Sequence, residues 1–79
     1  MITPAQCRAA RALLDWSQRE LAEAVGMSLR SLQGFEAGER VLQSLSIGAV
    51  ERILQSEGIE LINQTDWIGV RLRVRESRS

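Results

Sequence analysis

Apolar residues recur every three or four positions between Cys7 and Leu14, which is the period of an α-helix that buries one face. Thr3 followed by Pro4 is a typical helix start, with the threonine as N-cap and the proline in the first helical position. The pattern therefore predicts a helix over residues 4–14.

A second helix is predicted over residues 18–25, after a short break. Ser17 stands directly before it and Glu20 follows three residues later, which is the spacing of a capping box. Leu21 lies on its apolar face, and Gly26 follows its last turn, where glycine reverses the chain without steric cost. Local signals therefore bound this helix at both ends.

A third helix is predicted over residues 29–36, with Ser28 as its N-cap. Leu32 and Phe35 lie three residues apart and form its buried stripe. The opposite stripe consists of small and polar residues, namely Arg30, Gln33, Gly34 and Ala37. Two short helices with a glycine-containing turn between them form a helix-turn-helix over residues 17–36, an arrangement whose second helix enters the major groove of DNA.

A fourth helix is predicted after an irregular stretch that runs from Gly38 to about Leu45. Ser46 is expected to be its N-cap, and Gly58 is expected to end it. Its apolar positions have helical spacing and are expected to face the core; they are Ile47, Val50, Ile53 and Leu54.

Beyond Gly58 the period of the pattern changes from helical to alternating. Apolar residues and arginines alternate over residues 70–74, which is typical of a half-buried strand. Residues 59–62 can supply its partner, and residues 63–69 form a loose connection. A β-hairpin is therefore predicted over about 59–75.

The length sets the fold class. The chain has 79 residues, 44% of them hydrophobic, which suffices for one small domain over residues 1–79. The predicted elements make this domain mostly α-helical, with four helices and a short C-terminal β-hairpin. A chain of this size buries only roughly 60 to 65% of the surface that it exposes when unfolded, so a second copy would stabilise its thin core. A homodimer is therefore expected.

The composition excludes most catalytic and metal chemistry. There is no histidine and a single cysteine, Cys7, which leaves no intrachain disulfide, no zinc site of the usual ligand number and no imidazole base. We therefore expect no enzymatic activity and no cofactor, with Cys7 in the core. Apolar runs are short and no signal-like segment opens the chain, so we expect no membrane association and a cytoplasmic protein.

The net charge of zero conceals an asymmetry. Residues 67–79 carry four arginines and one glutamate, a net charge of +3, whereas residues 1–66 carry −3. An acidic body predicts weak non-specific binding to DNA and a shallow salt dependence, because affinity for DNA comes mainly from neutralised phosphates. Arg71, Arg73 and Arg75 can reach flanking DNA, contact a partner protein or solvate one side of the hairpin.

Specific residues open and close the two helices and form the turn between them; they are Ser17, Gln18, Leu21, Ala22, Val25, Gly26, Ser28, Leu32, Phe35, Glu36, Gly38 and Arg40. With these residues the segment 17–40 resembles the lambda-repressor/Cro-like helix-turn-helix family, also called the xenobiotic-response-element family. The resemblance extends back to Arg11 and forward to about Leu54, and it implies a DNA-binding domain.

The resemblance also implies roles for individual residues. Arg11 and Glu36 stand where family members form a buried ion pair, and Gln18 stands where the family places a phosphate contact. The first turns of the helix over residues 29–36 are implied to read bases. The candidates there are Ser28, Leu29, Arg30, Ser31, Gln33 and Gly34. Arg40 is a cation available for a further phosphate.

Direct readout of bases falls largely to two side chains. Arg30 can present its fork to guanine O6 and N7, and Gln33 can do the same for adenine N6 and N7. Leu29 can touch a thymine methyl group or lie at the edge of the core, and Gly34 can let the helix sit closer to the groove. Leu29 and Gly34 depart from the family pattern, in which these positions are often polar or basic.

Two functions are compatible with these observations. The first is a sequence-specific transcriptional regulator, a repressor or autoregulator, that binds a pseudo-palindromic double-stranded DNA operator as a homodimer. The alternative is a protein-interaction module whose third helix no longer reads DNA and whose arginine-rich hairpin docks on another regulator or on a toxin. Specific operator binding distinguishes the two.

Overall fold

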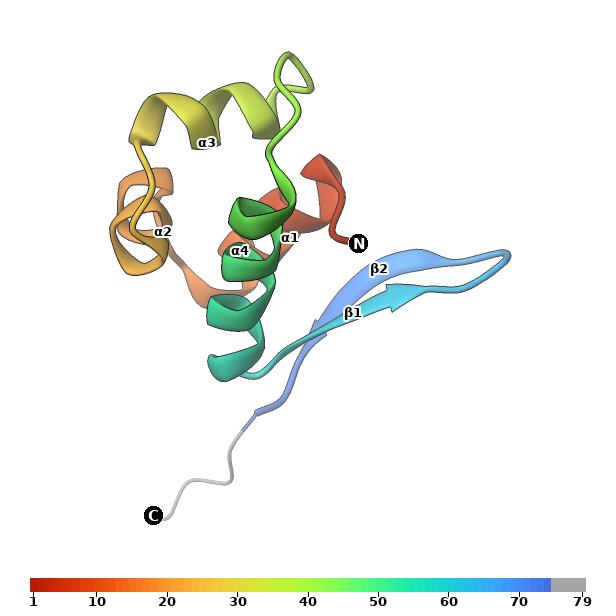
Figure 1. The fold of residues 1–79 in the computed structure, drawn as a ribbon. Coiled ribbons are helices and arrows are strands. Elements are labelled where there is room, and N and C mark those ends of the chain that lie inside the picture. Colours follow the sequence, from red (N-terminus) through yellow and green to blue (C-terminus); the bar gives the residue numbers. More distant parts are fainter. Residues whose placement is uncertain (75–79) are drawn as a thin grey trace, which may run out of the picture.

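The computed structural model describes residues 1–74 and contains four helices followed by a two-stranded antiparallel hairpin (Figure 1). The elements are α1 (Pro4–Leu14), α2 (Gln18–Val25), α3 (Leu29–Glu36), α4 (Ser44–Ser56), β1 (Ile59–Asn63) and β2 (Ile68–Leu72). The helices pack together as one body, and the hairpin projects from it as an arm. The predicted fold class is therefore confirmed. Arg75 and the rest of the basic tail lie outside the described residues.

The first three helices begin where the sequence predicts. The Thr3 hydroxyl accepts a hydrogen bond from the Gln6 amide, and the Ser17 hydroxyl accepts one from the Glu20 amide. In both cases the third helical side chain bonds back to the cap residue, which completes a capping box. Ser28 caps α3 in the same way, without the reciprocal bond.

Helix α4 begins earlier than predicted, because Gln43 and not Ser46 is its N-cap. The Ile47 amide donates to the Gln43 carbonyl at 2.9 Å, which closes the first turn and places Ser46 inside the helix. Leu42 and Ile47 occupy the two positions of a hydrophobic staple, and both pack in the core. The Gln43 side chain makes no capping hydrogen bond, so burial of the staple residues decides where this helix begins.

The two strands pair in register from Ile59 opposite Leu72 to Asn63 opposite Ile68. The loop between them comprises only residues 64–67, so the predicted loose connection is wrong at both ends. Pairing continues there because backbone groups bond across a hairpin whether or not the side chains alternate in polarity.

Strand β2 ends at Leu72 and does not continue to Val74, which is 81% exposed. Its partner strand begins at Ile59, so the register leaves no strand residue opposite Val74. The Arg73 amide makes the last cross-strand bond, to the Gly58 carbonyl at 2.9 Å. The hairpin over the described residues is therefore shorter than predicted.

The core lies between the four helices and the base of the hairpin. Leu21 of α2, Leu32 of α3 and Leu54 of α4 are fully buried, and Ile59 brings β1 into the same cluster. Cys7 of α1 is fully buried there too, as predicted.

Gln6 joins α1 to the hairpin and is itself only 2% exposed. Its amide nitrogen donates to the carbonyl of Gly69 at 2.8 Å and to that of Ile62 at 3.2 Å. Its side-chain oxygen accepts from the Thr3 amide at 3.0 Å. One side chain therefore completes the capping box of α1 and anchors both strands.

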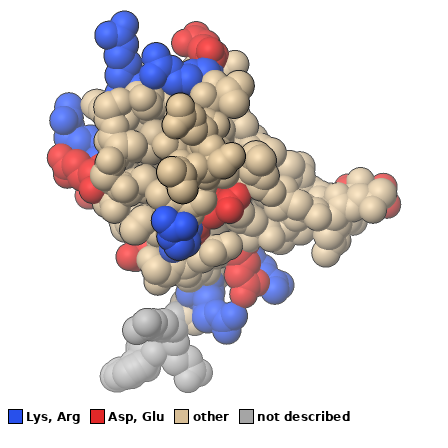
Figure 2. Space-filling model, in the orientation of Figure 1, with Lys and Arg blue, Asp and Glu red and all other residues tan. Residues whose placement is uncertain are grey.

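Charged side chains of both signs are spread over the molecule, both along its rim and in the middle of the displayed face (Figure 2). In this view basic atoms gather along the upper edge, over α3, with acidic atoms beside them. At the base of the arm, Glu60 accepts hydrogen bonds from Arg71 and Arg73, which are 73% and 74% exposed. These bonds, the one from Arg71 first, hold the pKa of Glu60 below its usual value.

Candidate nucleic-acid interface

The turn between α2 and α3 sets how the two helices meet. Gly26 has φ +85°, and its amide and that of Met27 both donate to the Ala22 carbonyl. Leu21 of α2 and Leu32 of α3 are buried in the shared core. The inner stripe of α3 is thereby held against the body, and the opposite stripe is left on the surface (Figure 1).

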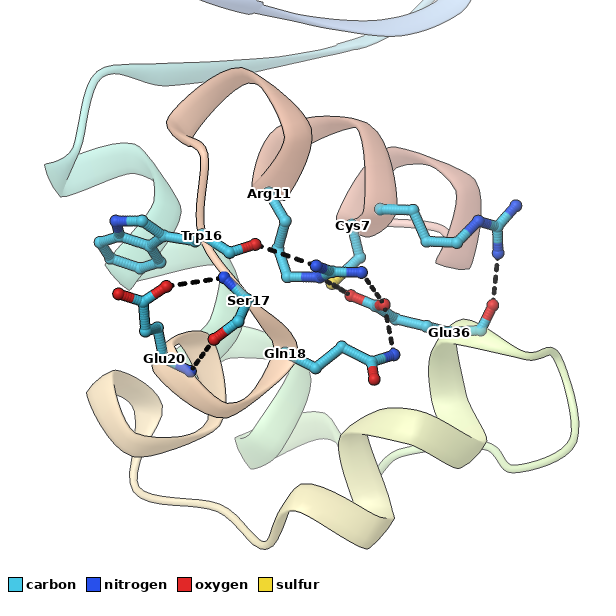
Figure 3. Close-up of polar contacts among 8 residues, drawn as sticks. Cys7, Arg11, Trp16, Ser17, Gln18, Glu20 and Glu36 are labelled. Atoms are coloured by element: carbon cyan, nitrogen blue, oxygen red, sulfur yellow. Dashed lines mark hydrogen bonds and ion pairs between the residues drawn. The ribbon is translucent and has the colours of Figure 1, made fainter.

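Glu36, the last residue of α3, is the centre of a polar network (Figure 3). Its side chain is 2% exposed. Oxygen Oε1 accepts from Arg11 Nη2 at 2.7 Å and from Gln18 Nε2 at 3.0 Å. Oxygen Oε2 accepts from Arg11 Nε at 2.8 Å and from the Cys7 thiol at 3.0 Å. These donors fill the lone-pair positions of the carboxylate and tie α3 to both α1 and α2.

The network determines the charge of its members. Burial alone raises the pKa of Glu36, but hydrogen bonds from Arg11, Cys7 and Gln18 outweigh it and hold that pKa below its usual value. The pKa of Arg11 is raised, chiefly by the hydrogen bond that Arg11 makes to Glu36. Burial, and then the bond to Glu36, raise the pKa of the Cys7 thiol far above its usual value. Cys7 is therefore a hydrogen-bond donor and not a nucleophile.

Two further bonds brace the ends of the helices around this network. Arg8 donates to the backbone carbonyl of Glu36, where the negative end of the α3 dipole favours a cation. Arg11 Nη1 donates to the Trp16 carbonyl at 3.0 Å, in the turn between α1 and α2. The ion pair implied for Arg11 and Glu36 is thus present, and it belongs to a larger set of contacts.

Gln18, for which a phosphate contact is predicted, is half-buried and has a structural function. One N–H of its amide is bound to Glu36, and its side-chain oxygen points away from that carboxylate (Figure 3). An amide carries two N–H donors, so the second stays available to a phosphate oxygen. The phosphate contact itself stays a prediction.

The residues predicted to read bases lie together on α3 and its cap. Ser28, Arg30 and Gln33 are exposed, and Leu29, Ser31 and Gly34 are half-buried. Leu29 does not belong to the core cluster, so it lies at the surface of α3. No ion pair among residues 1–74 involves Arg30. The outer stripe is therefore an accessible surface with a free guanidinium.

Arg40 follows α3 in the chain and lies against it in space. Its Nη1 donates to the Ser31 hydroxyl at 3.1 Å, and its side chain is exposed. It joins residues of the outer stripe around a shallow hollow, which is lined by Arg30, Gln33, Gly34, Ala37, Glu39 and Arg40. The sequence places Arg40 only after the helix, and its return to α3 depends on the intervening turn.

Other kinds of site are not apparent in the described part of the chain. Across residues 1–74 no three or more histidine, cysteine, aspartate or glutamate side chains are grouped so as to hold a metal ion. None of the helices within this range is long and apolar enough to cross a membrane.

Comparison with known proteins adds one finding. A family model described as helix-turn-helix matches residues 8–61, which is more than half of the chain. Comparison with curated proteins yields no match. The matched segment contains α2, α3 and all members of the Glu36 network except Cys7.

Proposed function

This chain belongs to the lambda-repressor/Cro-like helix-turn-helix family of DNA-binding domains, and we propose that it is a sequence-specific transcriptional regulator that places α3 in the major groove of double-stranded DNA. In this proposal it acts as a repressor or autoregulator and occupies a pseudo-palindromic operator as a homodimer. In this proposal the protein binds DNA and performs no catalysis.

The outer stripe of α3 is the observation that carries the proposal. Arg30 and Gln33 are exposed there, on a helix whose other end is held by the buried Glu36 carboxylate. Arginine matches the acceptors of guanine and glutamine matches adenine in the major groove. Two long hydrogen-bonding side chains on a fixed helix are what direct readout requires.

Phosphate contacts are proposed at the margins of this surface. Gln18 keeps one N–H donor at the start of α2, and the neighbouring Arg19 is exposed. Such contacts fix the register of a protein on the duplex and carry no sequence information. Because acidic residues accompany the cations around α3 (Figure 2), non-specific affinity is expected to be weak.

The hairpin arm supports the homodimer. Trp67 and Ile68, at its far end, are 71% and 61% exposed. A two-stranded sheet also leaves both strands with an open edge, and an isolated hairpin is at best marginally stable in water. A second copy that covers the arm would bury these apolar side chains and place two α3 helices on one duplex.

The same arm supports a second candidate function, a protein-interaction module that docks on another regulator or a toxin. Its base carries the exposed cluster of Glu60, Arg71 and Arg73, and its far end carries Trp67. An aromatic side chain together with arginines is the composition that protein interfaces favour. In this alternative α3 serves as scaffold and reads no bases.

A selection experiment tests the proposal. The full chain is incubated with a randomised double-stranded oligonucleotide pool and, separately, with DNA from upstream of its own gene, and bound sequences are titrated at several salt concentrations. We expect a palindromic sequence with two half-sites about one helical turn apart, bound with a shallow salt dependence. Failure to enrich any sequence, together with weak binding to all DNA, would reject the proposal in favour of the interaction module.

A further inference from the structure

We propose that Arg40 is a base-contacting residue of this interface and that it acts through the space left by the missing side chain of Gly34. This inference rests on the proposed function, because it concerns which side chains read the DNA. From the sequence, Arg40 is expected only to contact a phosphate, as one of the few available cations, so the two assignments differ in what they predict for specificity.

The stem of Arg40 packs closely against the position that a side chain at residue 34 would take. A Cβ atom built on Gly34 would lie 3.1 Å from Arg40 Cβ, 3.5 Å from Nε and 3.6 Å from Cδ. The first of these distances is closer than ordinary van der Waals contact between carbons. Glycine at this position therefore accommodates Arg40 against the bare backbone of α3.

The backbone holds Arg40 in this position. The amides of Glu39 and Arg40 both donate to the Gly34 carbonyl, at 2.9 Å and 3.1 Å. Gly38 lies in the tight turn between them and the helix, with φ +76°. The chain therefore folds back on α3 directly after the helix ends, and residue 40 returns to the level of residue 34.

The guanidinium extends toward the N-terminal turns of α3, beside the outer stripe that is proposed to face the bases. Its Nη1 donates to Ser31, which lies one turn toward the N-terminus from Gly34 on the same side of α3. The N-terminal residues of a recognition helix are the ones that contact base edges. Arg40 therefore extends along one edge of the outer stripe, toward the end of α3 that contacts bases, and borders the hollow lined by Arg30 and Gln33.

Arg40 retains the donors that readout needs. A guanidinium has five N–H donors, and within residues 1–74 the side chain uses one of its nitrogens, on Ser31. Arg40 takes part in no ion pair among those residues. It borders the same hollow as Arg30 and Gln33, so the surface presents two arginine forks in place of one. The matching ligand is the major-groove edge of guanine.

The experiment compares Arg40→Ala, Gly34→Ala and the double variant on the sequence that the wild-type chain selects from the randomised duplex pool. Arg52→Ala, on the exposed side of α4, is the matched control for loss of one positive charge. We expect Arg40→Ala to weaken binding about 5- to 100-fold and to relax preference at one base pair in each half-site. Gly34→Ala should relax preference at the same base pair to a smaller extent, since its Cβ forces the stem of Arg40 to shift slightly, and it should add nothing in the Arg40→Ala background.

If circular dichroism shows that Gly34→Ala does not fold, Arg40→Lys distinguishes a base contact from a phosphate contact. Lysine keeps the charge that a phosphate requires and loses the planar fork. The inference would be overturned if Arg40→Lys bound with wild-type affinity and the original base preference. It would also be overturned if Arg40→Ala lost affinity equally on all sequences. Either outcome would leave the proposed function intact. A wild-type chain that selects no sequence would overturn both.

Discussion

The guanidinium of Arg11 and the carboxylate of Glu36 form two parallel hydrogen bonds between α1 and α3, from Nε to Oε2 at 2.8 Å and from Nη2 to Oε1 at 2.7 Å. Arg11 is 18% exposed and Glu36 2%. Bidentate pairs of this kind are among the strongest hydrogen-bonded contacts in proteins, and burial protects this one from screening by salt.

Removal of either partner should destabilise the domain, because the other charge is left without compensation. We expect Arg11→Ala and Glu36→Ala each to lower the free energy of unfolding by about 3 to 5 kcal/mol, a large share of the stability of a small domain. Urea and thermal denaturation measure the loss. Glu60→Gln is the control in an exposed pair and should melt close to wild type. Near-native melting of both Arg11→Ala and Glu36→Ala would contradict a stabilising pair.

Acid should weaken the fold through Glu36. Its pKa is lower in the folded chain than in the unfolded chain, so its contribution to stability is complete above the ordinary glutamate pKa of about 4.3 and is lost as the pH falls through the folded-state value. We expect the melting temperature of the wild-type chain to decrease when the pH is lowered below this value. Glu36→Gln should be less stable at neutral pH and should respond less to acid. If the melting temperature of Glu36→Gln decreased with acid as steeply as that of wild type, the loss of stability would be due to other carboxyl groups.

Gln6→Ala should loosen the arm, because it removes the side-chain hydrogen bonds from α1 to the carbonyls of Ile62 and Gly69. The expected cost is about 1 to 3 kcal/mol of unfolding free energy. Hydrogen exchange should show faster exchange of hairpin amides, with the helices less affected. Gln55→Ala, at an exposed position of α4, is the control. Unchanged protection of the hairpin would mean that core packing of Ile59 alone holds the arm.

Arg30→Ala should reduce affinity for the selected DNA sequence by about 1 to 3 kcal/mol and relax one base pair in each half-site. Gln33→Ala should do the same at a different base pair. Fluorescence anisotropy with single-substituted duplexes measures both effects, and Arg52→Ala again controls for charge. If Arg30→Ala binds every duplex with unchanged affinity, α3 does not read bases through this side chain.

Trp67→Ser combined with Ile68→Ser should raise the dimer dissociation constant, since both side chains are exposed on the arm and would be buried by a second copy. Sedimentation velocity over a concentration series measures it, and circular dichroism verifies the helices. An unchanged dimer dissociation constant would mean that the dimer interface does not lie on the arm.

The helices with local capping signals were predicted to the residue, because a cap depends on groups within one turn. Thr3, Ser17 and Ser28 each bond the amide three residues ahead. The start of α4 was mispredicted because Ser46 is a favourable capping residue by sequence, whereas the observed N-cap, Gln43, makes no capping hydrogen bond and is set by the burial of Leu42 and Ile47. That selection is tertiary and has no local signature.

The site was predictable to a similar degree. The Arg11–Glu36 pair followed from the family resemblance. The bonds of Cys7 and Gln18 to Glu36 depend on how three helices meet. The placement of Arg40 over Gly34 depends on the turn after α3, which brings together residues whose separation in sequence suggests no contact.

The carboxylate of Glu36 has a consequence for the thermodynamics of association. Since donors from α1 and α2 orient α3 within the folded domain, this helix does not have to become ordered when a ligand binds. The loss of conformational entropy that accompanies such ordering, which reduces affinity in proteins that fold on binding, occurs here during folding. Changes in heat capacity on association then report the burial of the interface alone, and Glu36, which lies away from the outer stripe, contributes to affinity by keeping that stripe rigid.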